Sequence, residues 1–186
     1  MSALDGKEQV AQFYEEFQSR GKYDYFYGDQ RRKNLYVELI GKGKTILEVG
    51  CRAGNLTQFY HEGNQVVGVD VDRNALKEFE KRLGLTGHWV DVDSENLPFE
   101  DGQFDIVVFS EVMEHLRFPQ KALGEIARVL KSDGRVVGSV PNAFRLRNRL
   151  KFLVGKPFES DPSHLRSYSH SSIRIELAPS FEEIVI

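Results

Sequence analysis

Cysteine is nearly absent from this chain. Cys51 is the only one among 186 residues, so no internal disulfide can form, and no Cys/His spacing is that of a zinc site. Long apolar runs are absent too, since none approaches the ~20 residues that span a bilayer. Residues 1–8 also lack the basic and then apolar profile of a secretory signal. We therefore expect a soluble, cytoplasmic protein without a metal centre.

The sequence contains no internal repeat, no low-complexity tract and no large excess of one charge. Its 25 basic and 28 acidic residues give a net charge of −3, and 40% of the residues are hydrophobic. A chain of this length and composition can bury a substantial core, which predicts a single domain over residues 1–186.

The clearest local pattern is an apolar run that turns at two glycines. Residues 45–49 predict a buried strand, Gly50 and Gly54 a tight turn, and residues 56–60 the start of a helix. Glycine lets the backbone approach a ligand, and the first turn of a helix offers unpaired N–H groups. A second apolar run ends at Asp70, whose carboxylate can accept hydrogen bonds from both hydroxyls of a ribose. Together these features predict a site for a nucleotide-type cofactor.

Strands and helices alternate along the rest of the chain. The apolar spacing predicts helices over about 7–19, 35–40, 72–83, 119–130 and 171–177, and further strands over 66–69, 88–92, 103–110, 135–140 and 181–186. This order predicts an α/β fold, a Rossmann-like three-layer sandwich whose mainly parallel sheet binds ligands at the carboxyl ends of its strands.

The six predicted strands leave no residues for the final antiparallel strand that related sheets usually have. We therefore expect a six-stranded sheet or a shortened sequence. An edge without that cover would be a site at which a homodimer pairs.

An ordered series of segments resembles one protein family. The segments are Ile46–Gly54, Val69–Asp70, Asp93–Phe99, Phe104–Val108, Glu111–His115 and Arg128–Gly134. In this order they resemble the class I S-adenosylmethionine-dependent methyltransferases, and most of all the small-molecule branch that includes the ubiquinone and menaquinone pathway enzymes. The resemblance covers residues 44–142 and, more loosely, 164–166. It implies S-adenosyl-L-methionine as the cofactor and a small-molecule methyl acceptor.

The resemblance implies that the glycine turn meets the methionine part of the cofactor. Glu48 would lie just before the turn, and Gly50, Cys51 and Gly54 would let the backbone approach the ligand. Arg52 departs from the family, which usually has glycine at this position. The turn must therefore tolerate a side chain here, and we expect Arg52 to point outward or toward an anion.

The same resemblance implies contacts for the residues that follow the next strands. Asp70 would hold the ribose and Val71 would lie against the adenine. Asp93 would accept a hydrogen bond from the adenine amino group, beside the backbone of Ser94. The residues just past the fourth strand would flank the sulfonium: Ser110 and Glu111.

Two histidines are candidates for the proton transfer of the implied reaction. The chemistry is a direct displacement in which an acceptor atom attacks the methyl of the sulfonium, and it requires no metal. A neutral histidine suits removal of the acceptor's proton, which makes His115 and His164 the catalytic candidates. Alternatively, His115 bonds a backbone carbonyl and His164 hydrogen-bonds a loop.

Basic residues concentrate after the fifth strand. Residues 134–158 hold six cations and no acids, and Leu146, Leu150 and Leu153 share one helical face. Such a helix attracts an anionic acceptor, contacts a membrane surface that holds a lipid-soluble one, or is simply solvated beside the pocket. No base-stacking pattern accompanies the charges, so nucleic acid is a disfavoured partner.

The chain divides by this pattern into three parts of one methyltransferase domain. Residues 1–43 are expected to form an N-terminal helical lid, residues 44–142 the cofactor-binding core, and residues 143–186 a substrate-side helix and the last strand. In the first part, the aromatic residues Tyr23, Tyr25, Phe26 and Tyr27 would either cover the site or pack between helix and sheet, and Arg31 would meet a carboxylate.

Two other functions are compatible with parts of this pattern. A dinucleotide-binding enzyme needs G-x-G-x-x-G, but Arg52 and Asn55 stand at the second and third glycine positions counted from Gly50. A non-catalytic protein that binds the cofactor or regulates another process on the same fold stays open, because of Arg52 and the short C-terminus.

Overall fold

The computed structural model describes residues 6–18, 30–157, 161 and 163–186. The α-helices in these ranges are α1 Gly6–Gln18, α2 Gln30–Ile40, α3 Arg73–Leu83, α4 Pro119–Val129, α5 Leu146–Leu153 and α6 His170–Leu177. The β-strands are β1 Thr45–Val49, β2 Gln65–Asp70, β3 Thr86–Trp89, β4 Phe104–Ser110 and β5 Leu130–Ser139. The predicted aromatic lid residues Tyr23, Tyr25, Phe26 and Tyr27 lie outside the described residues. No helix within the described ranges combines the length and apolarity needed to cross a bilayer.

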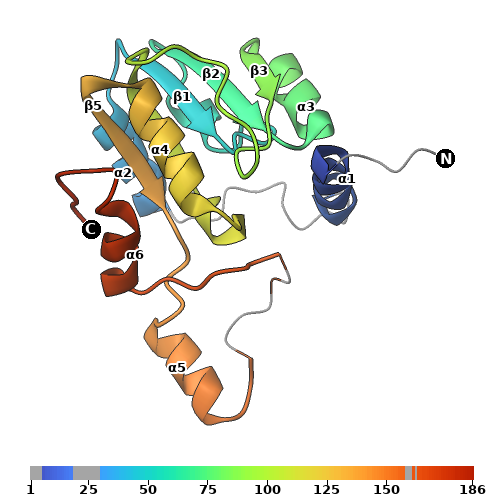
Figure 1. Ribbon diagram of the computed structural model, residues 1–186, viewed down its shortest axis with the longest axis vertical. Coiled ribbons are helices and arrows are strands. Elements are labelled where there is room, and N and C mark those ends of the chain that lie inside the picture. Colours follow the sequence, from blue (N-terminus) through green and yellow to red (C-terminus); the bar gives the residue numbers. More distant parts are fainter. Residues whose placement is uncertain (1–5, 19–29, 158–160, 162) are drawn as a thin grey trace.

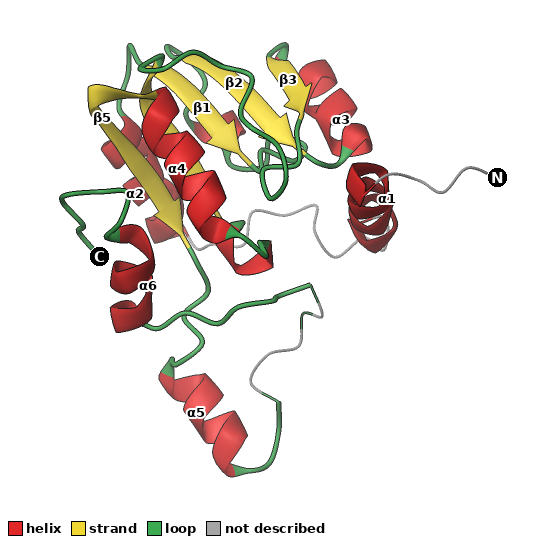
Figure 2. Cartoon of the chain, viewed as in Figure 1, coloured by secondary structure: helices red, strands yellow, loops and turns green. Residues whose placement is uncertain are grey.

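The strands form one sheet with the order β3-β2-β1-β4-β5, and all its pairs are parallel (Figure 2). The chain runs outward from β1 through β2 to β3 and then crosses back to β4 on the other side of β1. The strand order therefore switches between β1 and β4, where open α/β sheets bind their ligands. The predicted α/β fold with a mainly parallel sheet is confirmed.

Helices cover both faces of the sheet, because side chains alternate between its faces along each strand. Leu47 and Val107 belong to a buried cluster with Leu123 of α4, whereas Ile46 and Ile106 cluster on the other face with residues of α2. Figure 1 shows α4 in front of the sheet and α2 behind it. Burial of each such side chain contributes about 1.5–3 kcal/mol, so these two clusters hold the three layers together.

Helix α3 has the ends that the sequence predicts. The Asp72 carboxylate accepts hydrogen bonds from the backbone N–H groups of Asn74 and Ala75 at 2.9 and 3.0 Å, and Gly84 ends the helix with φ of +66°. An aspartate cap satisfies donors that the helix itself leaves unpaired, and glycine adopts the left-handed conformation without strain.

The segment after the glycine turn differs from the prediction. Instead of the start of an α-helix, residues Thr57–Phe59 form a single turn of 3₁₀-helix. The hydroxyls of Thr57 and Tyr60 both point inward and donate to the buried Glu48 carboxylate. Gly63, at φ +81°, then turns the chain toward β2, which begins at Gln65.

The prediction of a strand over residues 181–186 is wrong. These residues have no regular structure, so the described part of the sheet has five strands rather than six. Arg174 of α6 donates to the carbonyl of Ile184 at 2.8 Å, which holds the segment beside that helix and away from the sheet. The third strand also ends at Trp89, three residues earlier than predicted. Pairing of two copies at a sheet edge stays a prediction.

Candidate functional site

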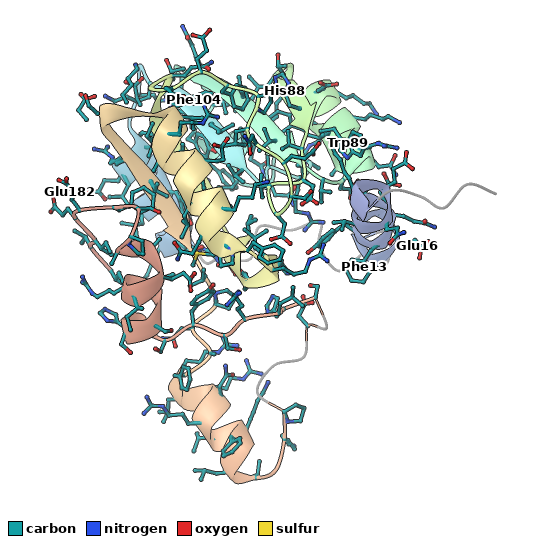
Figure 3. All side chains as sticks on the ribbon, viewed as in Figure 1. Phe13, Glu16, His88, Trp89, Phe104 and Glu182 are labelled. Atoms are coloured by element: carbon teal, nitrogen blue, oxygen red, sulfur yellow. The ribbon has the colours of Figure 1, made fainter. Side chains whose placement is uncertain are left out.

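A cavity of about 1520 Å³ lies at the carboxyl ends of the parallel strands. Residues at or just after the ends of β1, β2, β4 and β5 line it, including Val49, Asp70, Ser110 and Ser139. Helix α1 contributes Val10, Phe13 and Tyr14 to the wall, and the segment 163–165 adds to it as well. Figure 3 shows Phe13 on α1 near this end of the sheet. The cavity therefore lies at the switch in strand order, as the fold predicts.

The two glycines of the turn have different roles. Both have positive φ, +76° at Gly50 and +79° at Gly54, but only Gly50 lines the cavity. A Cβ on Gly50 would come within 2.3 Å of Val112 Cγ2, and one on Gly54 within 2.4 Å of Leu83 Cδ1. Gly54 thus packs closely against α3, and its contact with a cofactor stays a prediction.

Arg52 fits the turn in a left-handed conformation with φ of +49°. Its backbone N–H donates to the Asp70 carboxylate at 2.8 Å, and the residue lines the cavity. The positive charge of Arg52 acts to lower the pKa of Asp70, which fits the expectation that its side chain lies toward an anion. A residue with a side chain costs about 1–2 kcal/mol here relative to glycine. The hydrogen bond to Asp70 comes from the backbone, so it holds the turn closed whichever residue stands at position 52.

Cys51 serves packing within the turn. Its thiol is buried beside β2, where a Cβ on Gly68 would come within 2.5 Å of the sulfur. Burial raises the pKa of the Cys51 thiol, and the nearby Asp70 charge raises it further. A thiol that stays protonated is a poor nucleophile, so the interpretation of Cys51 as a small turn residue fits the structure.

Asp70 is a buried carboxylate that the turn holds in place. One oxygen accepts the N–H of Arg52 and the other accepts the N–H of Asp72, both at 2.8 Å. Burial raises the pKa of Asp70, while these two hydrogen bonds oppose the shift. Since a carboxylate oxygen can accept two hydrogen bonds, each oxygen retains capacity on the cavity side. The geometry therefore suits the predicted recognition of a pair of hydroxyls.

Trp89, which the sequence did not single out, is not part of the cavity lining but holds Val71, which is. Its ring NH donates to the carbonyl of Val71 at 3.0 Å, which fixes the backbone beside the predicted adenine position. The side chains of Lys7 and Arg73 lie over the same ring, 3.6 and 3.7 Å from its centroid (Figure 3 labels Trp89). Lys7 also pairs with Glu95 at 2.6 Å, so α1 is tied to the core at the wall of the cavity.

The acidic residues after β3 that line the cavity are Asp91 and Asp93. Asp93 lines the cavity, accepts the N–H of Phe118 at 2.7 Å and pairs with Arg117 at 3.1 Å. Ser94 does not line the cavity, and its hydroxyl donates to Asp91 at 2.6 Å. Asp91, which the sequence analysis did not name, lines the cavity instead. The contacts of Asp93 and Ser94 with an adenine stay predictions.

A polar network closes the end of β4. Arg32 of α2 donates to the hydroxyls of Ser110 and Ser139 and pairs with Glu111 at 2.8 Å. The Tyr36 hydroxyl lies 2.8 and 3.0 Å from the same two serine oxygens and donates its single proton to one of them. Arg32 thus forms an arginine–carboxylate pair that the sequence did not indicate, whereas Arg31 is exposed and its contact with a carboxylate stays a prediction. Helical spacing puts Arg32 and Tyr36, four residues apart, on the inner face of α2.

The two candidate histidines lie together at the cavity. Their ring centroids are 4.8 Å apart, and His115 Nδ1 is 3.1 Å from the carbonyl of Ser163. Burial lowers the pKa of His115 below its ordinary value of 6.5, so the ring is neutral near pH 7. The tautomer in which Nδ1 donates to that carbonyl leaves Nε2 as an acceptor.

Glu48 gives a testable dependence of stability on pH. The carboxyl is 3% exposed, and burial raises its pKa from 4.5 to about 7, although hydrogen bonds from Thr57 and Tyr60 oppose the shift. Between these pH values the folded chain keeps a proton that the unfolded chain has released. The contribution of Glu48 to stability is therefore full below pH ~4.5 and lost as pH rises through ~7, a change of about 3 kcal/mol.

Glu48→Gln removes this titration and keeps an acceptor oxygen. We expect the free energy of unfolding of the parent protein to fall relative to that of the variant as pH rises from 5 to 8. Urea unfolding of both proteins at the two pH values measures the difference. An identical pH dependence for both would contradict the assignment of a raised pKa to Glu48.

Comparison with known proteins agrees with this site. Residues 47–138 match the family described as a methyltransferase domain. The phthiotriol/phenolphthiotriol dimycocerosates methyltransferase 1 of Mycobacterium ulcerans is 37% identical over 108 residues, which are 55% of this chain and 39% of that protein. The ubiquinone/menaquinone biosynthesis C-methyltransferase of Desulfotalea psychrophila is 32% identical over 115 residues, 59% of this chain and 47% of that protein.

The fold has solved counterparts as well. A SAM-dependent methyltransferase from Thermotoga maritima superposes with a TM-score of 0.71 at 18% identity, over 94% of this chain and 81% of that chain. At this identity the likeness concerns the fold alone. The chain spans less than half the length of the two curated relatives described above.

Proposed function

Because the chain belongs to the class I S-adenosylmethionine-dependent methyltransferases, we propose that it transfers the methyl group of S-adenosyl-L-methionine to a small-molecule acceptor. The observation on which this depends most is the cavity at the strand ends, which combines a preformed glycine turn, the buried Asp70 and two histidines. S-adenosyl-L-methionine, when bound, supplies a methyl group already activated by its sulfonium.

The residues of the cavity fit this cofactor. The spare acceptor capacity of Asp70 suits the ribose, and Gly50, which lines the cavity at the turn, would present its backbone to the methionine part. Glu111, held by Arg32, would present a partly negative wall to the sulfonium together with Ser110. Val71 and the acidic residues Asp91 and Asp93 would surround the adenine.

The chain's contribution to the reaction would be alignment and proton transfer. Walls from α1, the strand ends and the segment 163–165 would hold the acceptor within attack distance of the methyl, which lowers the barrier by several kcal/mol. His115 is neutral near pH 7 and would accept the proton of the acceptor through Nε2, with His164 beside it.

The surface of α5 supports a lipid-soluble acceptor. Leu146, Leu150 and Leu153 are 72, 55 and 78% exposed, so the predicted apolar face of this helix covers no part of the core. Figure 1 shows α5 projecting away from the sheet. The cations of the helix would attract an anionic surface while its leucines enter the acyl region. The relatives named for quinone and dimycocerosate synthesis agree with an acceptor of this class.

Replacement of two leucines tests this surface. Leu150→Glu with Leu153→Glu should weaken cosedimentation with phosphatidylglycerol vesicles at least tenfold, because each buried leucine contributes about 1.5–3 kcal/mol. Ile175→Glu is the matched control, since Ile175 is 74% exposed on α6 and should have no effect. Equal binding by both variants would leave an anionic, water-soluble acceptor as the better proposal.

Calorimetric titration with S-adenosyl-L-methionine and its demethylated product, paired with a methyl-transfer assay over quinols and hydroxylated lipids, tests the function itself. The expected result is micromolar binding and turnover on at least one acceptor. No comparison favours the non-catalytic alternative, but tight binding without turnover on any acceptor would. Absence of cofactor binding would overturn both.

A further inference from the structure

Glu114 is a buried acid that the proposed methyl transfer does not use. The residue is 1% exposed, and among the described residues neither oxygen of its carboxylate receives a hydrogen bond. It lies in the single 3₁₀ turn Met113–His115 after β4 and lines the cavity. A buried acid without a donor costs several kcal/mol unless it is protonated or binds a cation.

Two imidazoles stand beside this carboxylate. One donor atom from each of Glu114, His115 and His164 lies within 4.8 Å of the other two. His115 is the next residue in the same turn, whereas His164 comes from a segment almost 50 residues further along the chain. All three line the same cavity. One carboxylate and two imidazoles from two segments therefore lie close together. No hydrogen bond among the described residues compensates for the burial of the Glu114 carboxylate.

The backbone holds this arrangement in place. The carbonyl of Glu114 accepts the N–H groups of Leu165 and Arg166 at 2.9 and 3.1 Å, so the segment carrying His164 is anchored to the residue that carries the carboxylate. The Arg166 side chain donates to the carbonyl of Arg117 at 2.9 Å and fastens the same two segments again. The hydrogen bond between His115 Nδ1 and the Ser163 carbonyl orients that ring and leaves Nε2 for a ligand.

We propose that Glu114, His115 and His164 bind a divalent transition-metal ion at the wall of the cavity. One carboxylate and two imidazoles are a mixed oxygen and nitrogen set that suits Zn²⁺, Mn²⁺, Co²⁺ or Fe²⁺. An ion about 2.1 Å from each donor needs the donors about 3–3.5 Å apart, which rotation of the three side chains can supply from the present spacing. The sequence expectation of no metal is revised by this proposal.

The charge and openness of the site also favour a dication. Glu111 and Asp161 both act on the His115 pKa as nearby negative charges. Arg32, which acts on the Glu114 pKa as a positive charge, is paired with Glu111, so together with Glu114 the negative charges named here outnumber it. Three protein ligands leave one or more positions open toward the cavity, the pattern of a catalytic rather than a structural metal site. An ion there would occupy His115 Nε2, so it would replace the proton acceptance proposed for that nitrogen by lowering the pKa of a hydroxyl that it binds in the cavity.

Metal binding by the intact chain tests the proposal without any assay of methyl transfer. After chelator treatment and dialysis, Co²⁺ titration should give visible absorption bands at one equivalent, and Mn²⁺ titration followed by electron paramagnetic resonance should give one tight site. The Kd expected for the first equivalent is micromolar or lower for Zn²⁺, and much weaker for Mg²⁺, which prefers oxygen ligands.

Conservative variants assign the ligands. Glu114→Gln, His115→Gln and His164→Gln should each raise the Kd for Co²⁺ at least tenfold and change the visible spectrum. Glu62→Gln and His61→Gln are matched controls outside the cavity lining and should bind as the parent does. Circular dichroism establishes that each variant is folded, and since the ligands come from two segments, any one folded variant suffices for the test.

The outcomes separate this proposal from the methyltransferase function. Stoichiometric Co²⁺ binding that the three variants abolish supports the site, whether or not methyl transfer is observed. Absence of binding to the parent protein, or binding unchanged in all folded variants, overturns it and leaves Glu114 a buried neutral acid. Cofactor titration in the presence of a chelator then tests the proposed function by itself.

Discussion

Asp70→Ala should abolish cofactor binding, with a rise in the Kd for S-adenosyl-L-methionine of at least about 100-fold. The carboxylate is buried and accepts hydrogen bonds from the backbone N–H groups of Arg52 in the glycine turn and of Asp72 just after β2. Each hydrogen bond from a ligand hydroxyl to a charged acceptor contributes about 1.5–3 kcal/mol, and two would be lost. Isothermal titration calorimetry measures the change for the cofactor and for its demethylated product.

A matched control separates binding from folding. Asp105 also accepts a backbone N–H, that of Thr45 at 2.7 Å, but lies at the amino end of β4, away from the cavity. Asp105→Ala should lose stability while its affinity for the cofactor stays unchanged. Unfolding in urea shows whether Asp70→Ala is still folded under the conditions of the titration. Unchanged affinity in folded Asp70→Ala would refute the proposed ribose contact.

Gly50→Ala should lower the free energy of unfolding by about 2–5 kcal/mol and weaken cofactor binding at the same time. A side chain at φ of +76° costs about 1–2 kcal/mol, and the new Cβ would overlap Val112 Cγ2 at 2.3 Å, which adds about 1–3 kcal/mol. Urea unfolding measures the loss of stability, and calorimetry measures the loss of affinity.

A second substitution divides these two costs. Val112→Ala removes the overlapping methyl group and leaves the Val112 Cβ position 3.6 Å from the new Cβ, an ordinary contact. The double variant Gly50→Ala, Val112→Ala should recover the steric part of the loss and keep the part due to φ. If the loss of unfolding free energy in the double variant equals the sum of the losses in the two single variants, overlap with Val112 is not the cause of the loss in Gly50→Ala.

The fold was predictable because most of its signals are local. Several elements have a signal in their own residues: the apolar runs of β1, β2 and β4, the Asp72 cap of α3 and Pro119 at the start of α4. The alternation of strands and helices then predicts a parallel sheet. The errors fall where tertiary contacts override local pattern. Residues 181–186 have the composition of a strand, but they find no partner edge and lie beside α6.

The site was predicted in outline and missed in detail for the same reason. Strand ends place Gly50, Asp70 and Ser110 together because parallel strands all end at one edge of the sheet. By contrast, the choice of Arg32 over Arg31 depends on which face of α2 packs inward. The position of Trp89 depends on the exact end of β3. No local pattern specifies either one.

The sequence by itself determined the order of the elements, the glycine turn and the acid at the end of the second strand, since each depends on residues adjacent in the chain. Only the tertiary structure decided that Glu114, His115 and His164 share one point, that Gly54 serves packing, and that the leucines of α5 stay exposed. Those features depend on contacts between distant segments, and burial and hydrogen bonding across the fold select them.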